Sequence, residues 1–375
     1  MSLADDCIVL VPGLFGFGAF GAGRGGAPRI DYFAEVKKVL SARTGVTQAR
    51  IRSTEPPPTG ALAHRVAELV TEIEQVLAAA PDGARVHVVG HSTGGVDARL
   101  LANPAYHAFT GHGVEDERRR RVAARLGHVV TLSAPFHGTP CAVKLRPEFK
   151  GLVAALSLWN VLDHGGALAG ALGPLVATLL GALQVVARDG RANAGVVELL
   201  DRLGVDHATV GEIVKFRDAI LRDDALLDDL APGRMEAMNA RLAPDPIAIE
   251  SYVTASPRPA LGDLGGLERR AFYLLLHHAT SDASFTPAAF PHGRWLVGAH
   301  DHDLVGNAPE ASDGVVPASS QTVSGEAAGI VLADHEDVIG HFDGQENTTL
   351  FKSGSGFTRA RFARLWADVA ARLGR

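Results

Sequence analysis

A serine in a glycine-rich turn is the residue whose surroundings point most clearly to chemistry. The string Gly90-His91-Ser92-Thr93-Gly94 follows the apolar run 86–89 and precedes a helical pattern. Small residues on both sides of such a turn let the strand and the helix approach each other, and the serine hydroxyl is raised above the sheet at a helix N-terminus. We therefore predict that Ser92 is a nucleophile. The alternative interpretation is a serine that only caps the helix.

A serine nucleophile needs a base, and the base needs a carboxylate that orients it. His335 lies in the string Asp334-His335-Glu336-Asp337, which comes just after the apolar run 330–332. We therefore place His335 at the carboxyl end of a late strand. Asp313 lies earlier, in the turn Ser312-Asp313-Gly314, which agrees with the chain order serine, acid, histidine. We predict that His335 is the base and Asp313 its orienting acid. The competing candidates are His341 and His91 for the base, and Asp301 and Asp303 for the acid.

An ester-cleaving serine also needs donors that stabilise the oxyanion. One donor is the backbone amide after the nucleophile, here Thr93, and the other should lie in the loop after an early strand. The turn Val11-Pro12-Gly13-Leu14 fits, and we predict the Leu14 amide. Losing one such donor raises the barrier by about 3 kcal/mol. A phosphate-binding loop is disfavoured because no Gly-Lys-Ser or Gly-Lys-Thr is present.

The elements that must position these residues alternate along the chain. Short apolar runs predict buried strands at 7–11, 86–89, 129–132 and 330–332. Apolar residues spaced three and four apart predict helices over 62–77 and 362–373. Strands alternating with helices indicate an α/β fold with a mostly parallel central sheet, whose ligands bind beyond the carboxyl ends of the strands.

Residues 141–245 break this alternation, because they are helical in character throughout. Their middle, residues 167–187, carries no charge over 21 positions, which is long enough to cross a membrane. The glycines, Pro174 and the lack of basic flanking residues favour a cap or lid over a membrane span or a buried hairpin. We therefore predict one α/β core, residues 1–140 and 246–375, with a helical lid insertion at 141–245 and no transmembrane span.

Composition excludes several classes of protein. The chain has 375 residues, 46% of them hydrophobic, and a formal charge of −6, so it is folded and is not primarily a nucleic-acid binder. Its two cysteines, Cys7 and Cys141, supply neither a disulfide framework nor a four-cysteine metal site. The N-terminus shows no secretory signal. We expect a cytoplasmic protein, or a secreted one if a leader has been removed.

The motifs together resemble a family, the α/β-hydrolases, and within it the Pseudomonas-type bacterial triacylglycerol lipases. The motifs that carry the resemblance occur in the family's order over most of the chain. They are Gly13-Leu14-Phe15-Gly16-Phe17, Ile30-Asp31-Tyr32-Phe33, the Ser92 turn, Ala134-Pro135-Phe136-His137-Gly138-Thr139, Met238-Asn239-Ala240-Arg241, Asp313-Gly314-Val315-Val316 with Ser319-Ser320, and Asp334-His335-Glu336-Asp337. The resemblance implies the triad Ser92, Asp313 and His335, oxyanion donors at Leu14 and Thr93, and a lid that opens on lipid.

The chain departs from the family pattern at three points. Pro12-Gly13 stands where the family usually has His-Gly, extra glycine-rich residues at 19–28 intrude before Ile30, and the two cysteines do not match a family disulfide. Many relatives hold a structural calcium near the catalytic histidine; Asp337 matches one ligand and Asp303 is the candidate for another, but His341 stands where an oxygen ligand is expected. A second metal idea, His300-Asp301-His302-Asp303, is better explained as a solvated loop.

We expect a serine carboxylic-ester hydrolase, lipase-like, that cleaves medium- to long-chain acyl esters through an acyl-enzyme and needs no cofactor for its chemistry. Its partners would be lipid or other hydrophobic esters, met through the lid. The alternatives are a polyester (polyhydroxyalkanoate) depolymerase or an acyltransferase with the same triad, a non-catalytic lipid-binding protein, and a metal-dependent hydrolase.

Overall fold

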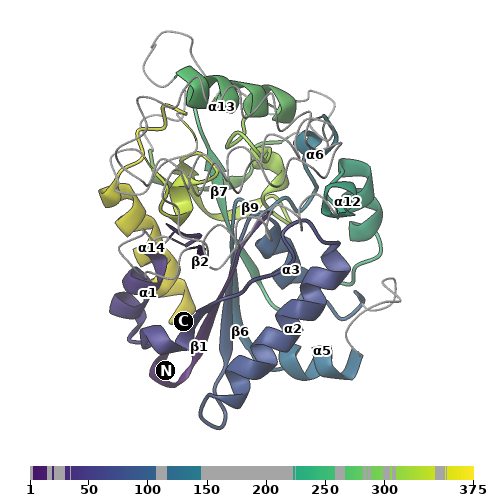
Figure 1. Ribbon diagram of the computed structural model, residues 1–375, viewed down its shortest axis with the longest axis vertical. Coiled ribbons are helices and arrows are strands. Elements are labelled where there is room, and N and C mark those ends of the chain that lie inside the picture. Colours follow the sequence, from purple (N-terminus) through teal and green to yellow (C-terminus); the bar gives the residue numbers. More distant parts are fainter. Residues whose placement is uncertain are drawn as a thin grey trace, which may run out of the picture.

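Seven parallel strands form the central sheet of the computed structural model (Figure 1). Their order across the sheet is β4-β1-β5-β6-β7-β9-β8. The strands are β1 (Cys7–Val11), β4 (Ile51–Ser53), β5 (Val86–His91), β6 (Leu126–Leu132), β7 (Ile249–Ala255), β8 (His292–Val297) and β9 (Glu326–Leu332). A separate antiparallel pair consists of β2 (Ala19–Phe20) and β3 (Ile30–Asp31). The structure describes residues 3–14, 19–20, 30–33, 35–106, 116–144, 223, 225–257, 267–281, 285, 289–298, 305, 310–342, 351 and 353–375.

The centre of the sheet is built from aliphatic strands. Every residue of β1 and β5 is buried, as expected for parallel strands covered on both faces. The strand predicted at 7–11 is confirmed, and those predicted at 86–89, 129–132 and 330–332 lie within the longer strands β5, β6 and β9. Strands β1 and β5 pair in register, from Cys7 opposite Val86 to Val11 opposite Gly90.

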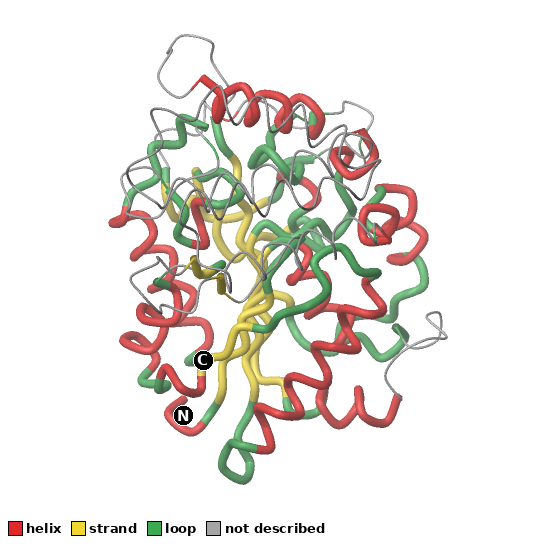
Figure 2. Tube along the Cα trace, viewed as in Figure 1, coloured by secondary structure: helices red, strands yellow, loops and turns green. Residues whose placement is uncertain are grey.

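Helices cover both faces of the sheet (Figures 1 and 2). On one face, α1 (Val36–Thr44) packs against α14 (Arg359–Leu373). On the other, α2 (Leu62–Ala78), α3 (Thr93–Ala102) and α5 (Asp116–Ala123) pack together. The predicted apolar face of the last helix is buried, and its Trp366 indole donates to the Val338 carbonyl at 2.8 Å. The remaining α-helices are α6 (Pro140–Lys144), α11 (Ala225–Asp229), α12 (Pro232–Asn239) and α13 (Leu267–Thr280).

The end of the predicted insertion packs against the core. Leu226, Leu227 and Met235 are buried in the same apolar cluster as α2 and α3. Asp229 Oδ2 accepts from the Leu62 backbone N–H at 2.9 Å and so satisfies one of the free donors at the start of α2. The uncharged segment 167–187 lies outside the described residues. Within the described part of the chain, no helix is both long and apolar enough to cross a membrane.

The parallel order places the loops that follow β1, β5, β6 and β9 at one edge of the sheet. These loops carry Gly13, Ser92, Ser133 and His335. Asp313 lies in the connection between β8 and β9, and its carbonyl accepts from the His335 N–H at 3.1 Å, so it lies at the same edge. The three residues of the predicted triad, Ser92, Asp313 and His335, therefore come from one edge of the sheet.

Candidate active site

Ser92 lies in a strained turn between β5 and α3. Its φ of 54° and ψ of −129° are unusual for a residue with a side chain, a conformation that costs about 1–3 kcal/mol. A side chain at Gly94 would meet the backbone of Val11 and Pro12, and one at Gly90 would meet the backbone of Gly94. The glycines are therefore required for the close approach of strand and helix. Although Ser92 is the residue at the start of α3, its side chain makes no capping hydrogen bond, contrary to the capping interpretation.

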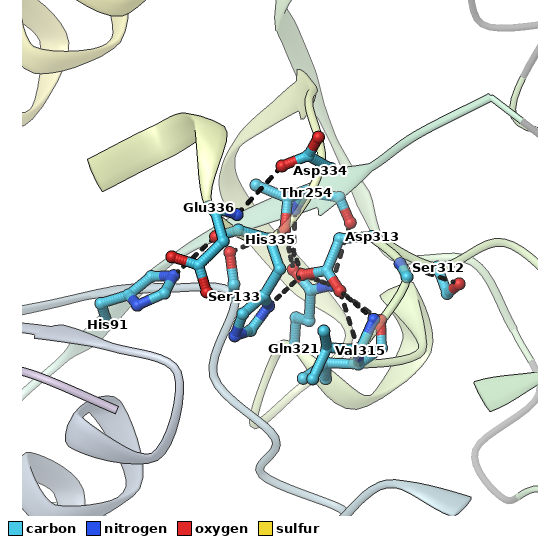
Figure 3. A network of polar contacts seen from close by, with 12 residues as sticks. His91, Ser133, Thr254, Ser312, Asp313, Val315, Gln321, Asp334, His335 and Glu336 are labelled. Atoms are coloured by element: carbon cyan, nitrogen blue, oxygen red, sulfur yellow. Dashed lines mark hydrogen bonds and ion pairs between the residues drawn. The ribbon is translucent and has the colours of Figure 1, made fainter. Parts of the chain in front are cut away.

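Asp313 and His335 form a buried pair. His335 Nδ1 lies 2.8 Å from Asp313 Oδ2, and because a carboxylate only accepts, the ring donates from Nδ1 (Figure 3). The second carboxylate oxygen, Oδ1, accepts from the backbone N–H groups of Val315 at 3.0 Å and Val316 at 2.8 Å. The fixed tautomer leaves the Nε2 lone pair of His335 free to take a proton.

Burial is the largest single effect on the pKa of His335, but the carboxylates of Asp313, Glu336 and Asp334 together outweigh it. Desolvation lowers the pKa of the imidazole, but the Asp313 carboxylate raises it through charge and hydrogen bonding, and the net shift of the pKa is upward. The arrangement therefore stabilises an imidazolium that forms after proton transfer.

The imidazole of His91 links the Ser92 turn to His335. His91 Nε2 donates to the His335 carbonyl at 2.9 Å, and the centres of the two rings are 4.7 Å apart. Among the described residues, no hydrogen bond joins Ser92 Oγ to a histidine ring. The structure thus pairs Asp313 with His335 directly, and brings Ser92 to them through its neighbour in the chain.

The turn after β1 lies against Ser92. A Cβ at Gly13 would be 2.9 Å from Ser92 Oγ, so only glycine fits there without displacement. The Gly13 N–H donates to the Tyr32 hydroxyl at 2.9 Å. Within the described part of the chain, the next amide, that of Leu14, and the amide of Thr93 have no hydrogen-bond acceptor. The Leu14 and Thr93 amides therefore stay the predicted oxyanion donors.

Arg65 contacts the turn after β1 through the Pro12 carbonyl, and the sequence analysis did not predict this role for Arg65. It is fully buried, and its guanidinium donates to Asp97 Oδ2 from Nε at 2.9 Å, to the Pro12 carbonyl from Nη2 at 2.8 Å and to the Pro57 carbonyl from Nη1 at 2.9 Å. The available signal was an arginine beside Leu62 and Val66 on the apolar face of the helix.

The competing candidates have other partners where the structure describes them. Both ring nitrogens of His91 are engaged, Nδ1 with the Tyr32 hydroxyl at 2.7 Å and Nε2 with the His335 carbonyl. His341 Nε2 lies 3.0 Å from the Tyr32 carbonyl. Asp301, Asp303 and the His300–Asp303 string lie outside the described residues.

The calcium suggested by the resemblance does not fit the described ligands. Asp337 Oδ2 accepts from the Asp334 N–H at 2.8 Å and from the Ser355 hydroxyl at 2.7 Å, so protein donors face it. His341 offers a nitrogen that already bonds the Tyr32 carbonyl, whereas calcium prefers oxygen. Over the described ranges, no group of three histidine, cysteine, aspartate or glutamate side chains could hold a metal ion.

Comparison with known proteins gives a likeness in structure alone. No family model matches the sequence, and no curated protein matches it either. Lipase 1 from Pelosinus fermentans is 16% identical, with a TM-score of 0.50 over 98% of this chain and 99% of that one. EstA from Clostridium botulinum is 16% identical, with a TM-score of 0.48 over 98% of this chain and 87% of that one. The mature form of lipase BlEst2 from Bacillus licheniformis is 14% identical, with a TM-score of 0.43 over 90% of this chain and 87% of that one.

The likeness to lipase 1 agrees with the parallel central sheet and the helices that flank it. The chain has an α/β-hydrolase fold.

Proposed function

We propose that this protein is a serine carboxylic-ester hydrolase. The observation that carries the proposal is the buried hydrogen bond between His335 Nδ1 and Asp313 Oδ2, set beside the strained Ser92 turn at the carboxyl edge of the sheet. Nucleophilic ester cleavage requires a histidine that a carboxylate holds in this tautomer, close to a serine whose hydroxyl does not cap the helix.

The proposed reaction has two halves. Ser92 Oγ attacks the ester carbonyl while His335 Nε2 takes its proton; the alcohol leaves with that proton, and an acyl-enzyme remains. Water then attacks the acyl group, His335 again takes the proton, and the acid is released as Ser92 regains its hydrogen. The amides of Leu14 and Thr93 would stabilise the oxyanion of each tetrahedral intermediate.

The proposed substrates are hydrophobic esters with medium or long acyl chains. The apolar composition of residues 167–187 supports this proposal, as does the resemblance to the Pseudomonas-type lipases. Lipase 1 from Pelosinus fermentans, which is similar to this chain in fold, is a lipase by name. Transfer of the acyl group to an alcohol, or hydrolysis of a polyester, would use the same residues and is the second candidate.

The proposal is tested by labelling and by turnover. A fluorophosphonate should modify wild type once, at Ser92, and should not modify Ser92→Ala. A panel of p-nitrophenyl esters from acetate to palmitate should then show higher kcat/KM for the longer chains, with product analysis in the presence of alcohols to detect transfer. A folded wild-type protein that neither reacts with the label nor cleaves any ester would refute the proposal and favour a non-catalytic lipid-binding protein.

A further inference from the structure

Ser133 has a backbone conformation that serine rarely adopts. Its φ is 57°, in the left-handed region, and it is one of three non-glycine residues with positive φ among those the structure describes, with Ser92 and Glu35. It lies at the end of β6, the neighbour of the strand that leads to Ser92, and it is completely buried. Glycine would adopt this conformation without strain, so the presence of serine needs a reason in its side chain.

The Ser133 hydroxyl has a single described partner, Thr254 on β7. The two hydroxyl oxygens are 2.7 Å apart, and Thr254 Oγ1 is also 2.7 Å from Asp313 Oδ2 (Figure 3). A carboxylate only accepts, so the one proton of Thr254 goes to Asp313. Ser133 must then donate to Thr254, and the chain of donors runs from Ser133 through Thr254 to Asp313.

This chain resolves a competition at Thr254. Its hydroxyl also lies 3.1 Å from Gln321 Oε1, which already accepts from the Thr254 backbone N–H at 2.7 Å. One proton therefore faces two acceptors, the carboxylate and the amide oxygen. A donor on the opposite side of Thr254 Oγ1 fixes the rotation of the hydroxyl and strengthens its bond to the carboxylate, because hydrogen bonds in a chain polarise one another.

We propose that Ser133 is a positioning residue for the Asp313–His335 pair, acting through Thr254. The inference rests on the proposed function, in which that pair activates Ser92. The strained serine is retained at the end of β6 because its hydroxyl fixes Thr254 toward Asp313 Oδ2, the same oxygen that accepts from His335 Nδ1. Without the hydroxyl, Thr254 can turn toward Gln321, and the carboxylate is held less firmly in line with the imidazole.

Two substitutions at one position separate the hydroxyl from the backbone. Ser133→Gly removes the hydroxyl and the strain together, so we expect thermal stability to stay close to that of wild type or to rise. Ser133→Ala removes the hydroxyl and keeps the strain, so we expect its thermal stability to be lower than that of wild type. Both should lose about five- to tenfold in kcat with little change in KM, the effect expected for one hydrogen bond that acts in the transition state. Equal losses of kcat in two variants of different stability would not follow from a structural role.

A double substitution tests the route through Thr254. Thr254→Val keeps the shape of the side chain and removes the hydroxyl, so it should lower kcat by at least as much as Ser133→Gly. Adding Ser133→Gly to Thr254→Val should change kcat by less than about twofold, since residues that act through one contact are not additive. A wild-type kcat in Ser133→Gly would overturn the inference. So would a Ser133→Gly substitution that lowers kcat in the Thr254→Val background by as much as it does in wild type. If the glycine variant fails to fold, the alanine variant carries the same two comparisons.

A measurement without substrate keeps the inference apart from the proposed function. The Nδ1 proton of His335 should give a downfield proton NMR signal that is absent in Asp313→Asn. We expect this signal to move in Ser133→Gly, Ser133→Ala and Thr254→Val. If wild type cleaves no ester but the signal moves, the proposed function fails and the positioning role stands. If wild type cleaves esters and the signal is the same in all three variants, the positioning role is refuted.

Discussion

Tyr32→Phe removes one hydroxyl from the centre of the polar network behind the Ser92 turn. The hydroxyl accepts from the Gly13 N–H at 2.9 Å and donates to His91 Nδ1 at 2.7 Å. The direction is fixed, because His91 Nε2 donates to the His335 carbonyl and its Nδ1 must then accept in the neutral ring. Burial holds the pKa of His91 well below its usual value and that of Tyr32 well above it, so both stay neutral near pH 7.

The loss can be estimated from the two bonds. Each buried group left without its partner costs about 1–3 kcal/mol, so the free energy of unfolding should fall by about 2–4 kcal/mol once the site relaxes. The Gly13 turn also carries the Leu14 amide, the proposed oxyanion donor, and complete loss of such a donor raises the barrier by about 3 kcal/mol. A partial displacement should therefore lower kcat about tenfold, with KM nearly unchanged.

Tyr252→Phe is the matched control. Its hydroxyl donates to Asp368 Oδ2 at 2.6 Å, on the side of the sheet covered by α14. This variant should lose about 1–2 kcal/mol of unfolding free energy and keep the wild-type kcat. Urea unfolding and ester turnover measured on both variants decide the matter. Wild-type kcat in Tyr32→Phe, or an equal fall of kcat in Tyr252→Phe, would refute the reasoning.

Three further predictions concern the same site. Gly13→Ala places a Cβ 2.9 Å from Ser92 Oγ, so fluorophosphonate labelling and ester turnover should both slow by at least about tenfold. Arg65→Lys replaces a planar fork, whose three nitrogens reach three separate acceptors, with a single compact ammonium nitrogen. Urea unfolding should show a loss of about 2–4 kcal/mol, and kcat should fall because the Pro12 carbonyl is no longer held. The raised pKa of His335 places the acid limb of kcat/KM above about pH 6.5, measurable on a soluble short-chain ester, because only the neutral imidazole takes the Ser92 proton.

Each of these predictions has a control or an outcome that would contradict it. Gly233→Ala, on a helix with open space around the new Cβ, should leave labelling unchanged, and equal slowing there would remove the argument about Gly13. For Arg65, an unfolding free energy within about 0.5 kcal/mol of wild type would contradict the role of its three bonds. For His335, the stabilisation gained from its raised pKa is fully present below about pH 6.5 and is lost as the pH rises through the folded-state pKa. Activity and this part of the stability should therefore change in opposite directions with pH. Asp313→Asn should move the acid limb of kcat/KM to lower pH and remove this part of the stability.

Strands made of consecutive aliphatic residues could be predicted from the sequence, and strands that contain polar residues could not. The run 7–11 needs no partner to be recognised, because parallel strands covered on both faces are continuously apolar. In β7, Glu250, Ser251 and Thr254 interrupt the apolar residues, so the segment Ile249–Ala255 shows no clear pattern. The polar residue Thr254 on β7 donates its hydroxyl proton to Asp313, which lies in a neighbouring loop.

The same distinction applies to the site. Ser92 is marked by the glycines on either side of it, and His335 by the strand that precedes it, so local sequence was enough to single them out. Arg65 contacts the Pro12 carbonyl, 53 positions away in the chain, and Ser133 contacts Thr254, 121 positions away. Their roles depend on which strands and helices become neighbours, and local spacing does not contain that information.

The two strained serines give the strongest argument that this edge of the sheet is built for chemistry. Ser92 and Ser133 end neighbouring strands, and the Ser92 N–H donates to the carbonyl of Leu132, the residue before Ser133. A positive φ costs a residue with a side chain about 1–3 kcal/mol, and glycine would avoid most of that cost at either position. Strain of this kind persists only where the surrounding structure enforces it. Around Ser92 the backbone packs so closely that a Cβ at Gly13 or Gly94 would clash. If the turns served the fold alone, glycine would be the more stable choice at both positions. Under the proposed function, the strain preserves two hydroxyls: that of Ser92 would attack the ester, and that of Ser133 would help to hold Asp313 behind the base.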